Sequence, residues 1–166
     1  MRTNKGGKPI TPLAQALKLL TVRPRSVWEL KQLLLERKYS EEEIEPVISH
    51  LIHLGYLDDL KFMESWCYYR QHISPKGRWY VRRELALKGI SSCLLESHFN
   101  HFYSEEDELH CLKRLLEKKL GKKKAAESHH NEKDTEKIIA ALVRKGFRHS
   151  AVLDMFSQLG AKHLDN

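Results

Sequence analysis

Apolar residues recur at helical spacing along almost the whole chain, and this spacing predicts nine helices. Within each segment the apolar side chains return every three or four residues, which places them on one face of an α-helix. No segment alternates apolar and polar residues over the length of a strand. The sequence therefore predicts an all-α protein, with helices at 12–22, 26–37, 41–54, 59–72, 75–88, 92–102, 105–119, 134–145 and 149–159.

Residues typical of helix ends mark these segments. Ser26 with Glu29, and Ser40 with Glu43, have the spacing of a capping box. A second start signal is an N-cap residue followed directly by proline in the first turn of the helix. It occurs at Thr11 and at Ser74. Pro46 conflicts with the segment 41–54, because a proline past the first turn costs a helical hydrogen bond. We expect that helix either to bend there or to begin later.

Three segments align when Tyr39, Ile90 and Phe147 are superposed, at offsets of 51 and 57 residues. Six columns are then apolar in all three copies: Leu30, Val81 and Ile138; Leu34, Leu85 and Leu142; Tyr39, Ile90 and Phe147; Ile44, Leu95 and Val152; Ile48, Phe99 and Phe156; and Leu51, Phe102 and Leu159. Gly89 and Gly146 align with each other, whereas Lys38 occupies the glycine position of the first copy. Each copy is a helix, a turn and a second helix, preceded by one further helix.

The repeat predicts three tandem three-helix units in an elongated, curved array. The expected division is a disordered basic tail at 1–10 and units at 11–57, 58–103 and 104–166. The third unit includes a lysine-rich segment, 120–133, that lacks apolar periodicity and is expected to form a flexible loop. Arrays of this kind present a surface to a partner and rarely enclose a pocket.

The composition narrows the class of protein. The chain has 166 residues and a net charge of +7, which favours a polyanionic or acidic partner. No run of apolar residues reaches the length of a membrane span, and the N-terminus lacks the apolar stretch of a secretory signal. Three unclustered cysteines indicate free thiols. These features predict a cytoplasmic protein that does not bind a membrane.

Two motifs then carry a resemblance to a known family. Gly55-Tyr56-Leu57-Asp58-Asp59, followed by Phe62, Gly77 and Arg83-Glu84-Leu85 before Lys88-Gly89-Ile90, is similar to the signature of the RecX regulatory proteins. The third copy, from Leu142 to Phe147, resembles the C-terminal repeat of that family. The resemblance covers about residues 12–160. Lys38, Arg148 in a capping position and the lysine-rich segment depart from the family pattern.

The resemblance implies both a fold and a function. RecX proteins consist of tandem three-helix repeats, bind the RecA recombinase filament on single-stranded DNA, and restrain its recombinase, ATPase and co-protease activities in DNA repair and the SOS response. The chain is accordingly expected to act as a monomer without a cofactor. The alternative is a small basic helical protein that contacts nucleic acid directly.

The candidate partner-binding residues are basic. They lie in or just before the segment 75–88 and in the third copy, and they are Arg70, Lys76, Arg78, Arg82, Arg83, Lys88, Arg144, Lys145 and Arg148. A helical wheel with Val81 and Leu85 toward the core places Trp79 and Arg83 on the opposite face. We nevertheless expect Trp79 and its aligned partner Trp28 to pack against a neighbouring helix.

Catalytic and metal-binding patterns are missing from the sequence. There is no phosphate-binding glycine loop and no nucleophile elbow, so no enzyme activity is expected. Histidines at helical spacing, His50 with His53 and His98 with His101, are interpreted as helix-surface residues, because zinc needs four ligands, or three and a water. Of the neighbouring Asp58 and Asp59, one is expected to cap the following helix, above Tyr56 and Leu57.

Overall fold

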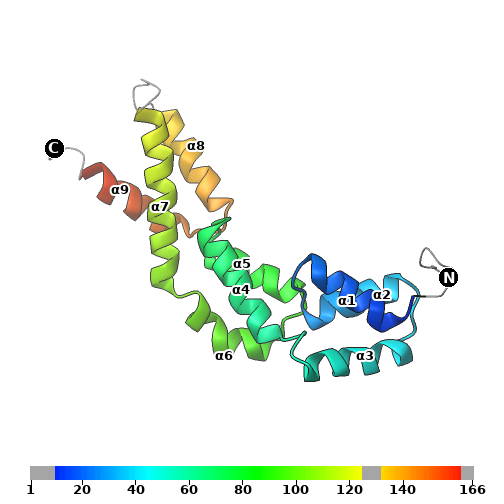
Figure 1. Cartoon of the computed structure of the whole chain (residues 1–166). Coiled ribbons are helices and arrows are strands. Elements are labelled where there is room, and N and C mark those ends of the chain that lie inside the picture. Colours follow the sequence, from blue (N-terminus) through cyan, green and yellow to red (C-terminus); the bar gives the residue numbers. More distant parts are fainter. Residues whose placement is uncertain (1–9, 125–131, 162–166) are drawn as a thin grey trace.

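Nine helices follow one another in a bent row in the part of the chain that the structure describes. The structure is a computed structural model that describes residues 10–124 and 132–161, with side chains at 10–120 and 135–159. The helices are α1 (Pro12–Val22), α2 (Val27–Glu36), α3 (Glu41–His53), α4 (Asp59–His72), α5 (Arg78–Leu87), α6 (Ser92–Phe102), α7 (Glu105–Lys124), α8 (Glu132–Val143) and α9 (His149–Ala161). Figure 1 shows α1–α3 at one end of the row and α7–α9 at the other, with α4–α6 at the bend.

Most predicted helix starts are confirmed by side-chain caps. The side chains of Thr11, Ser26, Ser40, Asp58 and Ser91 each accept a backbone N–H from the first turn that follows. Each cap satisfies a donor that the helix itself leaves without a partner.

Two local predictions were wrong, and one of the two alternatives expected at Pro46 does not occur. The helix predicted from residue 75 begins at Arg78 with Gly77 as its N-cap, so Ser74 does not cap it. Glu29 does not complete a capping box with Ser26, because its carboxylate binds Arg23 and Lys88. At Pro46 the later start does not occur, because α3 begins at Glu41 and continues to His53, close to the predicted 41–54.

The predicted lysine-rich loop is partly helical. Helix α7 continues to Lys124 and α8 begins at Glu132, so both ends of the segment 120–133 belong to helices. Residues 125–131 lie outside the described residues, as do residues 1–9 of the predicted basic tail.

The turn that joins the last two helices of each unit has the same backbone conformation in all three units. Gly89 and Gly146 have φ angles of 80° and 90°, and Lys38 has a φ of 67° at the equivalent position. Among the described residues other than glycine, Lys38 alone has a positive φ. The lysine that departs from the family pattern therefore adopts the left-handed conformation that glycine adopts at lower cost.

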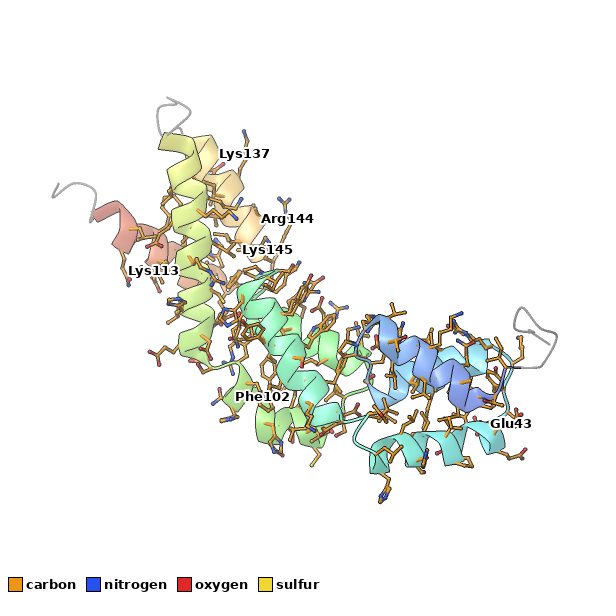
Figure 2. All side chains as sticks on the ribbon, viewed as in Figure 1. Glu43, Phe102, Lys113, Lys137, Arg144 and Lys145 are labelled. Atoms are coloured by element: carbon orange, nitrogen blue, oxygen red, sulfur yellow. The ribbon has the colours of Figure 1, made fainter. Side chains whose placement is uncertain are left out.

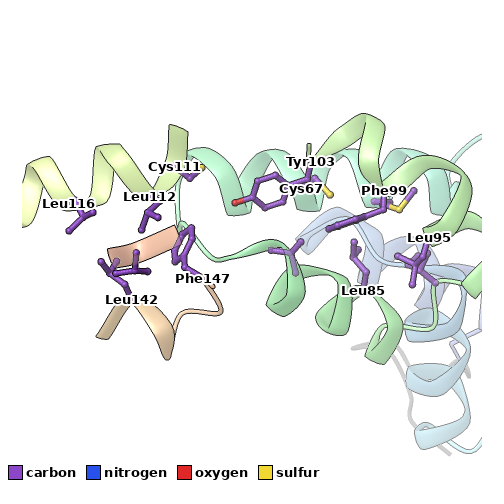
Figure 3. Packing of buried hydrophobic residues seen from close by; sticks show 14 of the residues in the cluster. Cys67, Leu85, Leu95, Phe99, Tyr103, Cys111, Leu112, Leu116, Leu142 and Phe147 are labelled. Atoms are coloured by element: carbon purple, nitrogen blue, oxygen red, sulfur yellow. The ribbon is translucent and has the colours of Figure 1, made fainter. Parts of the chain in front are cut away.

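The repeated apolar columns form the core. All eighteen residues are buried except Tyr39, Phe102 and Phe156, which are half-buried. They fall into two clusters, of which one belongs to the first unit alone. The other runs without interruption through the second and third units, as Figure 3 shows from Leu85 to Leu142. The second and third units are thus joined by an apolar core, and the first unit keeps a core of its own.

The joint between the first and second units is polar. The Ser26 hydroxyl donates to the carbonyl of Lys88, and a carboxylate oxygen of Asp59 accepts the N–H of Val27 at 2.9 Å. The Lys88 ammonium also lies 2.7 Å from the Glu29 carboxylate. The start of α2 therefore bonds to the second unit at both its cap and its first turn.

The joint between the second and third units repeats this arrangement. Gly77, which aligns with Ser26, donates its N–H to the carbonyl of Lys145 at 2.9 Å, and Lys145 aligns with Lys88. Glu108 accepts the N–H of Arg78 at 2.7 Å, as Asp59 does for Val27. The two joints are equivalent, so α5 follows α2 and α8 follows α5 along one side of the array.

Candidate functional site

Helix α5 carries an exposed stripe that combines aromatic, basic and aliphatic side chains. Trp79, Arg83 and Leu87 are four residues apart, so they lie along one face of the helix. Trp79 is 63% exposed and Leu87 is 68% exposed. The guanidinium carbon of Arg83 lies 5.5 Å from the centroid of the Trp79 ring. The stripe is opposite Val81 and Leu85, which are fully buried.

The prediction that Trp79 and Trp28 are packed was wrong for Trp79 and only partly right for Trp28. Trp28 is 47% exposed, although its Cβ lies so close to Gly89 that a Cβ built there would be 2.2 Å away. The two tryptophans align in the repeat, yet the one on α5 reaches further into solvent. The helical wheel correctly placed Trp79 on the face of α5 opposite Val81 and Leu85. No neighbouring helix in the described part of the chain covers the Trp79 side chain there, contrary to the prediction.

Three of the predicted basic residues are held by contacts within the fold. The Arg70 guanidinium binds both oxygens of Glu84, at 2.7 and 2.8 Å. Arg78 donates to the carbonyl of Tyr103 and to the side chain of Asn100, each at 2.8 Å. Lys88 pairs with Glu29 and lies over the Trp66 ring at 4.3 Å. These three side chains stabilise the units and their joints.

Arg148 has a weaker internal partner. Its guanidinium lies 3.4 Å from the carboxylate of Glu105 across a surface that leaves both side chains about 60% exposed. An ion pair of this exposure contributes little to stability, about 0–1 kcal/mol. Arg148 therefore remains available to a partner at low cost.

The other five predicted residues form no ion pair with a described carboxylate. We call them the basic surface: Lys76, Arg82, Arg83, Arg144 and Lys145. Lys76 lies over the ring of Tyr80 at 4.2 Å, and Lys145 bonds through its carbonyl to Gly77. Figure 2 shows Arg144 and Lys145 just after the end of α8 and beside the end of α4, with Lys137 on α8.

The electrostatics of the basic surface is most marked at Lys145. Burial lowers the pKa of its ammonium, and the positive charges of Lys76, Lys119 and Arg70 lower the pKa further. Like charges therefore gather where α8 ends against the second unit. A bound anion would relieve this repulsion.

A cleft of about 480 Å³ opens between the first and second units. Phe62, Trp66 and Tyr69 of α4 form an aromatic wall, and Arg23 and Lys88 stand beside it. Glu29 pairs with both of those cations, at 3.1 and 2.7 Å. The charges in this cleft are thus largely neutralised within the protein.

Sequence reasoning did not predict which carboxylates bind the predicted cations or accept backbone N–H groups at the joints. Glu29 and Glu84 both lie on second helices of their units, and Asp59 and Glu108 close the two joints. Burial raises the pKa of Asp59, and its hydrogen bond from Val27 opposes that shift. The sequence does hold one signal for these partners, because acidic residues such as Glu29 and Glu84 lie among the basic residues of the repeat.

The described residues give two further negative findings. Within residues 10–124 and 132–161, no helix has the length and apolar character required to cross a bilayer. Nowhere in the same residues do three His, Cys, Asp or Glu side chains gather in a way that could hold a metal ion. Of the predicted residues near the start of α4, Asp58 is the cap and Leu57 is buried, whereas Tyr56 is 62% exposed and does not pack beneath them.

Comparison with known proteins gives matches over most of the chain. The model of the first three-helix domain of RecX matches residues 13–51, and that of the second matches residues 58–97. The regulatory protein RecX of Chlorobium phaeobacteroides is 30% identical over 144 residues, which cover 87% of this chain and 90% of that protein. The regulatory protein RecX of Vibrio vulnificus is 32% identical over 133 residues, covering 80% and 82% of the two chains.

A solved structure has the same fold. The crystal structure of RecX from Lactobacillus salivarius superposes with a TM-score of 0.71 at 23% identity, covering 90% of this chain and 95% of the other. At that identity the likeness concerns the fold, and the sequence matches above concern the family. Together with the three equivalent helical units, they show that this chain belongs to the RecX family of regulatory proteins.

Proposed function

We propose that this chain binds a RecA recombinase filament assembled on single-stranded DNA and restrains its recombinase, ATPase and co-protease activities. In this proposal it acts in the cytoplasm as a monomer, in DNA repair and the SOS response, and catalyses no reaction of its own. The family supplies the regulatory role. The proposal adds the partner and the surface that contacts it.

One observation carries the proposal: the exposed stripe of α5 shares Arg83 with the basic surface, and Arg82 of that surface is the preceding residue. Tryptophan and arginine are the residues that contribute most to binding at protein interfaces. Arg82 and Arg83 have no carboxylate partner among the described residues, so binding a partner would not first require breaking an internal ion pair. A filament that includes DNA is a polyanion, which a surface of this charge would attract.

The arrangement of the units supports a partner with a repeating surface. The equivalent joints set α2, α5 and α8 in succession along one side of the array. A filament also presents equivalent positions in succession. The stripe of Trp79, Arg83 and Leu87 on the middle unit would then be the centre of the contact.

The test is reversal of charge at Arg82 and Arg83 of α5. The variant R82E/R83E keeps Arg78, because Arg78 bonds to Tyr103 and Asn100 and its loss would disturb the fold. Both substituted side chains are exposed, so the free energy of unfolding should change by less than about 0.5 kcal/mol per site. Half-inhibition of recombinase-driven strand exchange should require at least about tenfold more protein, which corresponds to about 1.4 kcal/mol.

The matched control is K18E/K113E, which makes the same change in net charge at exposed lysines of α1 and α7. Inhibition should remain close to that of the wild type. An equal loss of inhibition in R82E/R83E and K18E/K113E would show that net charge alone drives association with the filament. Undiminished inhibition by R82E/R83E would refute the role assigned to α5.

A further inference from the structure

Three lysines at the second joint form no ion pair with a described carboxylate, since the buried Glu108 there accepts the N–H of Arg78 instead. Lys76 lies in the turn before α5, Lys119 lies on α7, and Lys145 follows α8. The hydrogen bond from Gly77 to the carbonyl of Lys145 fixes the two chain segments next to each other. Lys76 and Lys145 are half-buried, as is Lys119. Lysines seldom gather in this way without an anion, because each charge disfavours the next.

The first joint shows where an anion sits in this architecture. There the Lys88 ammonium lies 2.7 Å from the carboxylate of Glu29. The second joint has Lys145 at the position of Lys88, but the position of Glu29 is taken by Tyr80. Tyr80 instead receives Lys76 over its ring, at 4.2 Å. The anion of the first joint has thus been replaced by an aromatic ring, whereas Lys76 keeps the positive charge that Arg25 has at the aligned position of the first unit.

The charge balance at the second joint is positive. Arg70 also lies nearby, but Glu84 pairs with it at 2.7 Å and neutralises it. The lowered pKa of Lys145, caused by burial and then by Lys76, Lys119 and Arg70, is consistent with charges that share one small region. Three lysines therefore remain for a ligand from outside the chain.

We propose that the second joint binds a phosphate group of a single-stranded nucleic acid, held by Lys76, Lys119 and Lys145. The proposal rests on the proposed function, which it deepens by naming the group that the surface contacts. The phosphate would supply the negative charge that the Glu29 carboxylate supplies in the first joint. Phosphate is a strong acceptor of hydrogen bonds from lysine, and its three donors here come from three separate elements.

A second feature favours nucleic acid over an acidic protein segment. Trp79 lies two residues after Gly77 and three after Lys76 in the sequence, and its ring is exposed. Bases of a single strand stack on exposed aromatic rings while neighbouring cations follow the backbone. The Trp79 and Arg83 pair therefore supplies a flat surface for the base that adjoins the bound phosphate.

The experiment compares the wild type with the variant K76Q/K145Q, using the full chain and a fluorescent oligothymidine strand across a range of salt concentrations. If both lysines share one phosphate, the slope of log K against log salt should become shallower by about 0.7. Affinity should fall by about tenfold, as expected for loss of a charged hydrogen bond. The control K18Q/K113Q, in which Figure 2 places Lys113 on the other side of α7 from Lys145, should keep the wild-type slope.

The outcomes separate this site from the proposed function. The melting temperature of K76Q/K145Q should not fall, because the substitutions remove repelling charges, so reduced binding cannot be attributed to unfolding. Wild-type slope and affinity in K76Q/K145Q would overturn the phosphate site, whatever R82E/R83E does to filament inhibition. Wild-type binding of the bare strand together with lost filament inhibition would also overturn it, since the cluster would then face a protein carboxylate.

Discussion

Gly77 is the residue at which the joint between the second and third units is most sensitive to one added atom. Its φ of −66° suits any residue, so alanine would add no backbone strain. A Cβ at this position would, however, lie 2.0 Å from the carbonyl oxygen of Gly146 and 2.5 Å from the backbone nitrogen of Phe147. Both are backbone atoms and cannot rotate away. Gly77→Ala must therefore push the turn of the third unit off α5.

The cost can be worked from these contacts. Overpacking at a close-packed site costs about 1–3 kcal/mol. The hydrogen bond from Gly77 to Lys145, 2.9 Å long, would stretch or break, at a further cost of about 0.5–1.5 kcal/mol. The expected destabilisation is about 1.5–4.5 kcal/mol. For a chain of this length about 2–4 °C of melting temperature correspond to each kcal/mol, so the decrease should be roughly 3–18 °C.

The assay combines thermal unfolding with amide hydrogen exchange. Exchange should accelerate at the end of α8 and the start of α9, where the displaced turn lies, and should change little in α1–α3, which have a separate core. Gly55→Ala is the control, because a Cβ there meets nothing within 4 Å and only its positive φ of 74° adds cost. A Gly77→Ala protein that is as stable as the wild type, or more stable by the 0.4–1 kcal/mol or so that alanine adds where it fits, would refute the geometry of the joint.

Three further predictions concern the ion pairs of Glu29, the cysteine thiols and the exposed Trp79. Burial alone would raise the pKa of Glu29, but hydrogen bonds from Arg23 and Lys88 lower it below its ordinary value of 4.5. Glu29→Gln should therefore destabilise the protein by about 1 kcal/mol at neutral pH, and the difference should vanish as the pH falls through the folded-state pKa of Glu29 in denaturant titrations; a constant difference would contradict this. At pH 8, iodoacetamide should modify exposed Cys93 first, since burial raises the pKa of the Cys67 thiol to about 12 and Cys111 is also buried; mass spectrometry showing rapid labelling of Cys67 would be inconsistent with the core. Trp79→Ala should leave the free energy of unfolding within about 0.5 kcal/mol while weakening filament inhibition, and a large drop in melting temperature would mean that the ring is packed.

The repeat explains why so much of the fold could be predicted. A stripe at helical spacing fixes which face of each helix is buried, and caps such as Ser40 and Ser91 fix where the helices begin. The alignment also placed Lys38 in a glycine position, and its φ of 67° confirms that the alignment was right at single-residue level. Local rules suffice for these features because neighbours along the chain determine them.

The joints could not be predicted, because they depend on which residues of one unit reach the next. Arg78 reads as a surface cation in the sequence, yet it bonds to Tyr103 and Asn100 across the second unit. Glu29 reads as half of a capping box, yet Lys88 of the next unit takes its carboxylate. A wheel gives the direction of a side chain and does not give what lies in that direction. Three of the nine predicted residues, Arg70, Arg78 and Lys88, are therefore held by internal partners that the helical wheel does not give.

Binding to the recombinase filament itself tests the central claim most directly. The measurement is the anisotropy of the fluorescently labelled chain, titrated with RecA filaments on single-stranded DNA, with RecA alone and with the bare strand, at one salt concentration. Binding to the filament should be at least about tenfold tighter than binding to the bare strand, and R82E/R83E should remove most of that difference. Equal affinity for the filament and the bare strand would contradict the proposal and make this chain a nucleic-acid-binding protein.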